Sequence, residues 1–344
     1  MLANGCGTVQ PMTEASGPAR LRRAVVTGGS GFLGSHLCER LLADRWHVVA
    51  VDNFSTGYRR NVTHLLDNRN FELVAADVCE PLDLSGSVDL ILNFASPASP
   101  PRYMDLAIET LKVGSMGTER MLQMASATGA RFVHASTSEV YGDPAVHPQV
   151  ESYWGNVNPL GPRSMYDESK RFAEALIMAY HRKRAVDVGV VRIFNTYGPR
   201  LDPDDGRVVS NFLAQALAGK PLTVYGDGLQ TRSFCYVDDE VDGILRLAYS
   251  DLIGPVNIGN PTEHTMLELA ETVIEVTGSS SAVEHRDLPA DDPSRRCPDI
   301  SQAVHALGWQ PRTPLREGLL LTAAWFRERA ALAETMAQRQ VGAH

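Results

Sequence analysis

The chain has 344 residues and a formal net charge of −9, with no run of five or six like charges. This distribution excludes the clustered basic surface of a nucleic-acid-binding protein, although a few placed arginines still suit an anionic small ligand. The apolar stretches fall far short of the ~20 residues that span a bilayer, so the sequence predicts a soluble protein without a membrane partner.

In chain order, residues 1–22 contain small, polar and proline residues without a hydrophobic signal core, and they predict a flexible N-terminal tail. Beyond them, short β-branched runs alternate with helical patterns. Strands are predicted at 23–28, 47–52, 71–77, 88–95, 131–136 and 186–194, and helices at 32–42, 106–128 and 166–184. Near-continuous apolar strands separated by helices indicate a Rossmann-like, doubly wound parallel sheet in an α/β protein.

The pattern changes after residue 195. Short strands at 222–226, 255–259 and 283–288 lie among helices and Pro/Gly turns. The sequence therefore predicts a first domain over 23–195 and a smaller C-terminal α/β substrate lobe over 196–334. We expect this lobe to be partly interwoven with the first domain and to be followed by a tail over 335–344.

The five cysteines, at positions 6, 38, 79, 235 and 297, form no C-x-x-C pair and are odd in number. The spacing therefore predicts neither a disulfide framework nor a zinc site, and no other metal site is expected. This cysteine usage favours a reducing, cytoplasmic environment.

The run TGGSGFLG places Gly28, Gly31 and Gly34 directly after a predicted strand and into a predicted helix. This spacing lets the backbone approach a pyrophosphate at the helix N-terminus. Asp52 ends the second strand, where a carboxylate accepts hydrogen bonds from the ribose hydroxyls and repels a 2′-phosphate. The pattern predicts NAD rather than NADP, with Asp77 at the adenine edge. The alternative is a glycine-rich turn with strand-end acids that only cap loops.

Tyr166 and Lys170 are four residues apart, so a helix places them on one face. A tyrosine phenol has a pKa near ~10, and a nearby ammonium group favours the phenolate. Thr137, at the end of the preceding strand, is placed to hydrogen-bond an oxygen that is being oxidised. The three residues form the pattern of a base acting on an alcohol. The alternative for the Tyr/Lys pair is a solvated helix face.

The motifs TGGSGFLG, DNFSTG, ASPASPPRYM, STSEVYGD, YDESK, RIFNTYGPR and TVYGDGLQTRSFCYVDD resemble those of extended short-chain dehydrogenases/reductases, over about residues 23–330. Longer runs are similar to the UDP-glucuronate decarboxylases in particular. These runs are HPQVESYWGNVNPLGPRSMYDESKR, DGRVVSNF, NIGNPTEHT and DDPSRRCPDI.

The resemblance implies two further sets of site residues. Around NAD it implies Phe32, Leu33, Asn53, Phe54, Thr56, Gly57, Val78, Phe94 and Ser96, together with Tyr166 and Lys170. Around a UDP-sugar substrate it implies Tyr103, Lys112, Ser138, Asn195, Arg207, Asn211, Tyr225, Arg232 and Arg296. It also implies a homodimer formed through the helices at 106–128 and 166–184, although the apolar stripe from Phe172 to Tyr180 is equally consistent with burial on the sheet.

The reaction implied by the resemblance starts with Tyr166 removing the proton of the sugar 4-hydroxyl while NAD takes a hydride. The resulting 4-keto sugar places the glucuronate carboxylate β to a ketone, so carbon dioxide leaves readily. Protonation at C5 and return of the hydride then give UDP-xylose. Ser138 stands where the similar 4,6-dehydratases carry an acidic residue that expels a hydroxyl, and this departure favours decarboxylation.

The roles of two residues near C5 stay open. Glu139 is placed to position the sugar or a water that protonates C5, or it is a strand-end acid paired with a base. Arg232 resembles an arginine that assists decarboxylation, either by holding the carboxylate or through a water, or it is a phosphate clamp. The competing functions are a nucleotide-sugar 4-epimerase, a 4,6-dehydratase and, as a non-enzyme, an NAD-binding sensor or scaffold.

Overall fold

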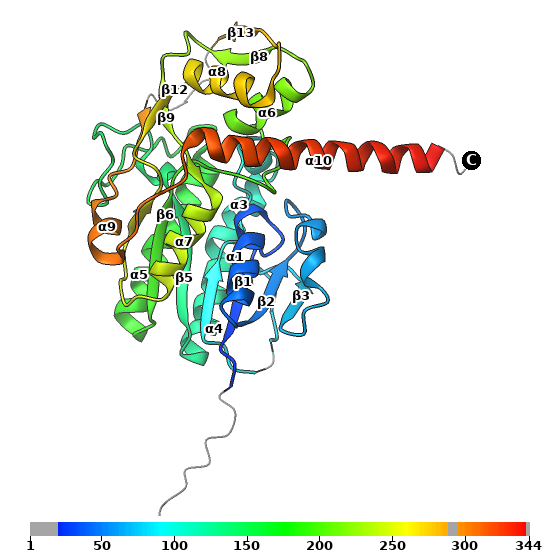
Figure 1. The fold of residues 1–344 in the computed structure, drawn as a ribbon. Coiled ribbons are helices and arrows are strands. Elements are labelled where there is room, and N and C mark those ends of the chain that lie inside the picture. The colour runs from blue at the N-terminus through cyan, green and yellow to red at the C-terminus, as the bar shows by residue number, and fades with distance from the viewer. Residues whose placement is uncertain (1–19, 85, 288–294, 342–344) are drawn as a thin grey trace, which may run out of the picture.

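The computed structural model describes residues 20–84, 86–287 and 295–341, with side chains up to residue 332. The predicted N-terminal tail thus lies almost entirely outside the described residues. The predicted C-terminal tail begins inside helix α10 (Leu315–Val341), whose far end projects away from the rest of the chain in Figure 1.

A seven-stranded parallel sheet forms the centre of the molecule (Figure 1). Its strands are β1 (Arg23–Thr27), β2 (His47–Asp52), β3 (Phe71–Ala75), β4 (Leu90–Asn93), β5 (Arg131–Thr137), β6 (Val188–Ile193) and β11 (Val256–Ile258). Their spatial order is β11-β6-β5-β4-β1-β2-β3. The strands β1, β2 and β3 follow one another toward one edge of the sheet, and β4, β5 and β6 follow one another from β1 toward the other edge. The predicted Rossmann-like, doubly wound sheet is therefore confirmed.

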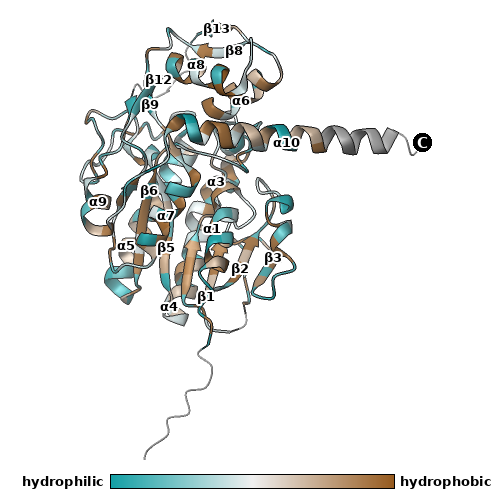
Figure 2. Ribbon diagram, viewed as in Figure 1, coloured by the Kyte–Doolittle hydropathy of each residue, from teal (hydrophilic) through white to brown (hydrophobic). Residues whose placement is uncertain are grey.

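Helices cover both faces of the sheet. Helices α1 (Phe32–Ala43) and α7 (Val237–Ala248) pack on one face, while α4 (Thr118–Thr128) and α5 (Ser164–Arg184) pack on the other. Successive side chains of a strand alternate between the faces, so Leu90 and Leu92 of β4 join one core cluster and Ile91 joins the other. Burial on both faces explains why these strands read as continuous apolar runs, drawn brown in Figure 2.

The segment predicted as one helix over 106–128 is helical from Ala107 to Thr128, with a π-helical turn inside it. It consists of α3 (Ala107–Lys112), the π-helical turn η3 (Val113–Gly117) and α4, and the short helix α2 (Pro100–Asp105) precedes it. At Gly114 a Cβ would lie 2.6 Å from the Cβ of Ser169, so the irregular turn approaches α5 too closely for a side chain. The predicted helix is therefore confirmed, whereas its π-helical turn was not predicted, because apolar spacing does not record this close approach.

The remaining elements build the second lobe. Helices α6 (Val208–Leu217) and α8 (Met266–Thr277) lie beside the parallel pair β8 (Leu222–Tyr225) and β13 (Val283–Arg286). A three-stranded sheet has the order β12-β9-β14, from β12 (Glu263–Thr265), β9 (Thr231–Ser233) and β14 (Arg295–Arg296). The pair β7 (Thr196–Tyr197) and β10 (Cys235–Tyr236), with α9 (Ser301–Leu307), completes the second half.

The chain passes between the two parts more than once. Residues Val256–Ile258, from the second half of the sequence, pair with β6 as the last strand of the large sheet. Within the described residues, no helix is long and apolar enough to cross a membrane. The carboxyl ends of β1, β2, β4, β5 and β6 all meet at one edge of the sheet, and this edge faces the second lobe.

Candidate active site

A continuous cavity of about 840 Å³ lies at the carboxyl edge of the parallel sheet. It is lined from one side by the turns that follow the strands and from the other by residues of the second lobe, including Arg207, Tyr225 and Arg296. A crevice at the point where the strand order reverses is the usual ligand position in this kind of sheet. Every site residue expected from the sequence lines it except Phe54.

The glycine loop fits a dinucleotide pyrophosphate. Gly28 has a positive φ of 68°, and a Cβ at Gly34 would lie 2.0 Å from the carbonyl oxygen of Gly28. No side chain caps the first turn of α1, so its N–H groups are available to an anion. The loop therefore forms a backbone cradle that side chains would fill.

Asp52 is held ready at the end of β2. Its carboxylate accepts hydrogen bonds from the Ser30 N–H at 2.9 Å and from the Phe54 N–H at 2.8 Å. Burial raises the pKa of Asp52 more than these two bonds lower it. A fixed carboxylate at this position suits ribose hydroxyls and disfavours a 2′-phosphate.

Phe54 does not line the cavity as expected. Its backbone has a positive φ of 59°, and its N–H points to the Asp52 carboxylate. The residue therefore acts through its main chain, by shaping the turn that orients Asp52. The contact of Phe54 with NAD that the resemblance implies thus stays a prediction.

Asp77 lies beside Asn53 in the same cavity. The Asn53 amide donates to Asp77 Oδ2 at 3.0 Å, and the Cys79 N–H donates to Oδ1 at 2.8 Å. Burial raises the pKa of Asp77, but these hydrogen bonds outweigh it and leave the pKa below its usual value. The carboxylate is thus ionised and oriented.

Tyr166 and Lys170 lie in the first two turns of helix α5, and both are buried. Lys170 Nζ donates to the carbonyl oxygen of Ala135 at 2.8 Å and lies 5.6 Å from the Tyr166 ring centroid. Burial lowers the pKa of Lys170 to about 8. Burial raises the pKa of Tyr166, and the adjacent Glu139 charge adds to this, while a hydrogen bond from Thr137 lowers it. The protein alone thus holds Tyr166 as a neutral phenol.

Thr137 ends β5 and begins the short 3-10 helix η4 (Ser138–Tyr141). Its hydroxyl accepts a hydrogen bond from the Glu139 N–H at 3.2 Å and makes a second one with Tyr166. The strand end therefore places a hydroxyl, a phenol and a carboxylate side by side. Tyr103 stacks on the Tyr166 ring with centroids 4.9 Å apart and so fixes its plane.

Glu139 forms ion pairs with two arginines. Arg296 binds it with both terminal nitrogens, at 2.6 Å and 2.8 Å, and Arg163 Nη2 lies 2.8 Å from Oε1. Burial raises the pKa of Glu139, but the charges of Arg296 and Arg163 outweigh it and lower the pKa below its usual value. Glu139 is therefore a carboxylate at neutral pH.

The other expected substrate residues line the second-lobe side of the cavity. Arg232 is buried in β9 and donates to the carbonyl oxygen of Thr231 at 2.8 Å. Arg207 pairs with Asp205, with Nη2 at 3.1 Å from Oδ1. The remaining members are Tyr103, Lys112, Ser138, Asn195, Asn211 and Tyr225. The arrangement combines several cationic groups with a buried phenol, as an anionic sugar nucleotide requires.

Two residues of this site were missed. Arg163 holds Glu139, and Asp167 lies nearby with a pKa raised to about 7 by burial and then by the Glu139 charge. Both residues lie close to Tyr166 in the sequence, and this closeness could have identified them as site residues. Nothing in the sequence marks which arginine pairs with which carboxylate.

The fold and this site define a dinucleotide-binding protein in which a glycine loop, an acidic strand end and a buried tyrosine line one cavity. The chain belongs to the NAD dependent epimerase/dehydratase family, whose model matches residues 24–259. This places NAD as the cofactor and confirms the resemblance to extended short-chain dehydrogenases/reductases.

Among curated proteins, the chain is 55% identical to UDP-glucuronic acid decarboxylase 4 of Arabidopsis thaliana, over 90% of this chain and 70% of that protein. It is 52% identical to UDP-glucuronic acid decarboxylase 1 of Xenopus tropicalis, over 89% of this chain and 72% of that protein. The predicted similarity to the UDP-glucuronate decarboxylases is confirmed. Among solved structures, a UDP-glucuronic acid 4-epimerase from Bacillus cereus with UDP-glucuronic acid and NAD aligns with a TM-score of 0.79 at 28% identity, over 89% of this chain and 99% of that one.

Proposed function

We propose that the chain is an NAD-dependent UDP-glucuronate decarboxylase, which converts UDP-glucuronate to UDP-xylose and carbon dioxide through a 4-keto intermediate. The observation that carries this function is the identity of 52–55% to UDP-glucuronic acid decarboxylases over most of the chain. Thr137, Tyr166 and Lys170 are all present in the cavity, which argues against a sensor or scaffold that binds NAD without chemistry.

Bound NAD would supply the acceptor, and later the donor, of a hydride at the sugar C4. The glycine loop, Asp52 and Asp77 would hold its phosphate, ribose and adenine parts, and Lys170 would contact the ribose beside Tyr166. These residues fit the group because they form a backbone cradle and two oriented carboxylates at one sheet edge.

Tyr166 acts as the base for the sugar 4-hydroxyl, and Thr137 hydrogen-bonds the same oxygen. Burial keeps the Tyr166 pKa high in the protein alone, so positive charge must enter the site before the phenol gives up its proton. The Lys170 ammonium, 5.6 Å from the Tyr166 ring, is already in place beside the phenol, so the additional charge comes with the bound ligands. The base thus becomes active only in the loaded site.

Glu139 positions the sugar and a water rather than donating a proton itself. Burial raises the pKa of Glu139, but the charges of Arg296 and Arg163 outweigh burial and lower the pKa below its usual value. Glu139 therefore stays ionised at neutral pH. Arg232 is always charged and holds the glucuronate carboxylate, while a water beside it protonates C5. Ser138 cannot act as a general acid, which is consistent with a reaction in which no hydroxyl has to leave.

The UDP part extends toward the second lobe. Asn195, Arg207, Asn211 and Tyr225 line that side of the cavity and are assigned to it, with Lys112 and Tyr103 nearer the sugar. Arg296 is assigned to the same ligand, and its two bonds to Glu139 support a position near the sugar. Its ordered guanidinium would link Glu139 to the substrate.

We further propose a cytoplasmic homodimer. Large apolar side chains are exposed on α2, α3, η3 and α5, namely Met104, Ile108, Leu111, Met116 and Phe172. An exposed apolar surface of this kind supports a protein–protein interface. The described cysteines are free thiols, which favours a reducing compartment.

Incubation with UDP-glucuronate tests the function. Mass analysis of the product should find a pentose nucleotide, with one equivalent of carbon dioxide released. A UDP-galacturonate product without carbon dioxide would indicate the 4-epimerase instead. A dehydrated six-carbon product from a nucleotide hexose would indicate the 4,6-dehydratase.

A further inference from the structure

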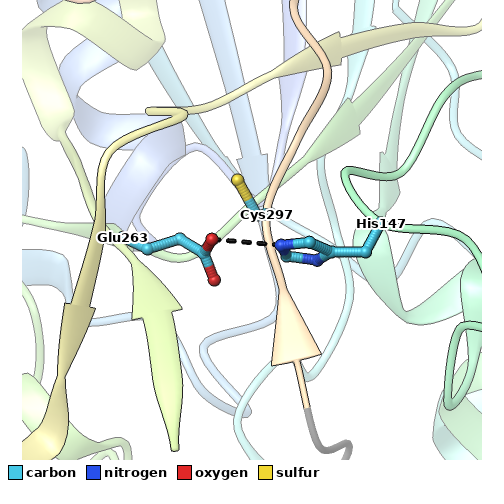
Figure 3. Close-up of side chains that lie close together, drawn as sticks. All are labelled: His147, Glu263 and Cys297. Carbon is cyan, nitrogen blue, oxygen red and sulfur yellow. Dashed lines mark hydrogen bonds and ion pairs between the residues drawn. The ribbon is translucent and has the colours of Figure 1, made fainter.

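A second group of polar side chains lies outside the main cavity. His147 in the loop after η4, Glu263 of β12 and Cys297 directly after β14 place their nitrogen, oxygen and sulfur atoms within 4.8 Å of one another. Figure 3 shows the imidazole and the carboxylate facing each other, with the Cys297 side chain beside their contact. His147 Nε2 lies 3.0 Å from Glu263 Oε2.

We propose that His147, Glu263 and Cys297 bind one Zn²⁺ ion. Imidazole, thiolate and carboxylate are the three ligand types that zinc takes in proteins, and a thiolate disfavours magnesium and calcium. Ligand atoms around a tetrahedral zinc lie about 3.3–3.7 Å apart, given bonds of about 2.0–2.3 Å. Small side-chain rotations therefore bring the three atoms from their present separations to this geometry.

The fourth coordination position would face an open cavity. This cavity has a volume of about 330 Å³, and it is lined by His147, Leu229, Gln230, Thr231, Glu263 and Arg295. It has room for a water as the fourth ligand, which is the arrangement of zinc sites with three protein ligands. The ion is thus reachable from solvent through the side that the protein leaves open.

Supporting contacts already orient the ligands. Thr231 Oγ1 donates to Glu263 Oε1 at 2.5 Å, which leaves Oε2 facing His147. Gln149 makes two hydrogen bonds to the backbone of Cys297. Its side-chain oxygen accepts from the Cys297 N–H at 2.8 Å, and its backbone N–H donates to the Cys297 carbonyl oxygen at 2.9 Å. Such outer contacts are typical of metal sites in proteins.

Cys297 would bind the ion as a thiolate. The thiol is buried, and its Sγ donates a hydrogen bond to the carbonyl oxygen of Pro261 at 3.3 Å. Zinc binding would replace the S–H bond by an S–Zn bond and release the proton to solvent. The Glu263 carboxylate, within 4.8 Å of the sulfur, would supply a second negative charge to the ion.

The ion would connect strands that carry two active-site arginines. In the sheet order β12-β9-β14, Glu263 lies on β12, and Cys297 directly follows β14. Arg232 lies on β9 between them, and Arg296 precedes Cys297 in the chain. A bound ion would therefore fix the backbone of the strands that carry both arginines.

The sequence predicted no metal here because the ligands are far apart along the chain. His147 and Glu263 are 116 residues apart, and no short spacing marks the group. Only the fold brings the loop, the strand and the segment after β14 together. The expectation of no metal site rested on local cysteine spacing, which this arrangement does not use.

The test is metal binding by the full-length protein. After treatment with a chelator and dialysis, the wild-type protein should take up one equivalent of Zn²⁺ by elemental analysis. Co²⁺ in place of Zn²⁺ should give sulfur-to-cobalt absorption in the near ultraviolet. Cys297→Ser should abolish this absorption and weaken Zn²⁺ binding by at least about 100-fold, since losing a direct ligand costs more than losing an outer contact.

Two controls make the result decisive. Cys79→Ser removes another free thiol and should keep both the absorption and the stoichiometry. Glu263→Gln should weaken binding while keeping the thiolate absorption at high Co²⁺. Circular dichroism of the metal-free variants should match the metal-free wild type. Absence of stoichiometric Zn²⁺ in the wild type, or equal binding by folded Cys297→Ser, would overturn the proposal.

Discussion

Arg296 binds Glu139 with two parallel hydrogen bonds of 2.6 Å and 2.8 Å, across 157 residues of sequence. The pair joins the end of β5 to β14, and so it connects the NAD-binding half of the cavity to the second lobe. Both side chains are almost fully buried, with 8% and 13% of their surfaces exposed. Removing one partner of such a pair leaves a buried charge and is costly.

Arg296→Ala should shift the acid limb of the pH–rate profile to higher pH. Arg296 is the strongest of the contacts that lower the pKa of Glu139, so without it burial raises that pKa. Glu139 works as a carboxylate, so activity is present above its pKa. When that pKa is raised, activity is lost at a higher pH than in the wild type as the pH falls. The measurement is kcat/KM for UDP-glucuronate against pH. Arg316→Ala, at an exposed ion pair, is the control, and an acid limb at the wild-type position in Arg296→Ala contradicts the role.

Tyr166→Phe should lower turnover by ~10³-fold or more, which corresponds to about 4 kcal/mol of barrier. The phenyl ring still stacks on Tyr103, so the site keeps its shape and NAD affinity should stay within a few-fold of wild type. Steady-state kinetics and NAD titration separate the two effects. Tyr249→Phe removes a surface hydroxyl as the matched control. Wild-type turnover in Tyr166→Phe would end the assignment of the base.

Asp52→Asn should weaken NAD binding and narrow the preference for NAD over NADP. Hydrogen bonds to a charged acceptor are worth about 1.5–3 kcal/mol, so the expected loss of NAD affinity is about 10- to 100-fold. The amide can still accept from Ser30 or Phe54, which preserves the turn. Equilibrium titration with each dinucleotide measures both effects. An unchanged NAD/NADP ratio would show that the carboxylate does not face the ribose.

Trp309→Ala should destabilise the fold by about 3–5 kcal/mol. Its ring is buried, and its Nε1–H donates to the Asp239 carbonyl oxygen at 2.9 Å, so truncation leaves both a cavity and an unpaired acceptor. Denaturant unfolding gives the free energy. Trp154, which is 89% exposed, provides the matched control, and Trp154→Ala should change the free energy of unfolding by less than about 0.5 kcal/mol. Equal effects of the two variants would contradict the described core.

Phe172→Asp combined with Ile108→Asp should convert the proposed dimer to a monomer. These side chains are 51% and 64% exposed in the single chain and lie on α5 and α3, which pack together. Charges there would have to be desolvated in an interface. Light scattering after size-exclusion chromatography reports the mass. Leu160→Asp, at a 94% exposed position, is the control. A monomeric wild type would reject the dimer.

The sequence predicted the parallel sheet and the residues at its carboxyl edge because both depend on local patterns. Apolar runs mark strands buried on both faces, and the residues that end those strands must meet at one edge. Thr137, Asp52 and the glycine loop were found in this way. The long apolar spacing of 106–128 gave no sign of the π-helical turn, which follows from contact with Ser169 in a different helix.

Side-chain pairing was beyond the sequence. The sequence did not predict that Arg296 binds Glu139 or that Arg163 does so too, and the contact of Arg296 with the UDP part stays a prediction. The hydrogen bond from the Lys170 ammonium to the Ala135 carbonyl oxygen was not predicted either, nor was the high pKa that burial gives the Tyr166 phenol. Such partners are chosen by tertiary packing between segments that have no fixed separation along the chain.

The pairing of β11 with β6 has a consequence for how the chain can be divided. A fragment that ends near residue 195 would contain the whole glycine loop and the catalytic helix, yet it would leave the β6 edge without its neighbour. An uncovered edge strand invites intermolecular pairing and aggregation. The nucleotide-binding half is therefore not an independent folding unit. It depends on β11, which begins about sixty residues after its apparent end at residue 195.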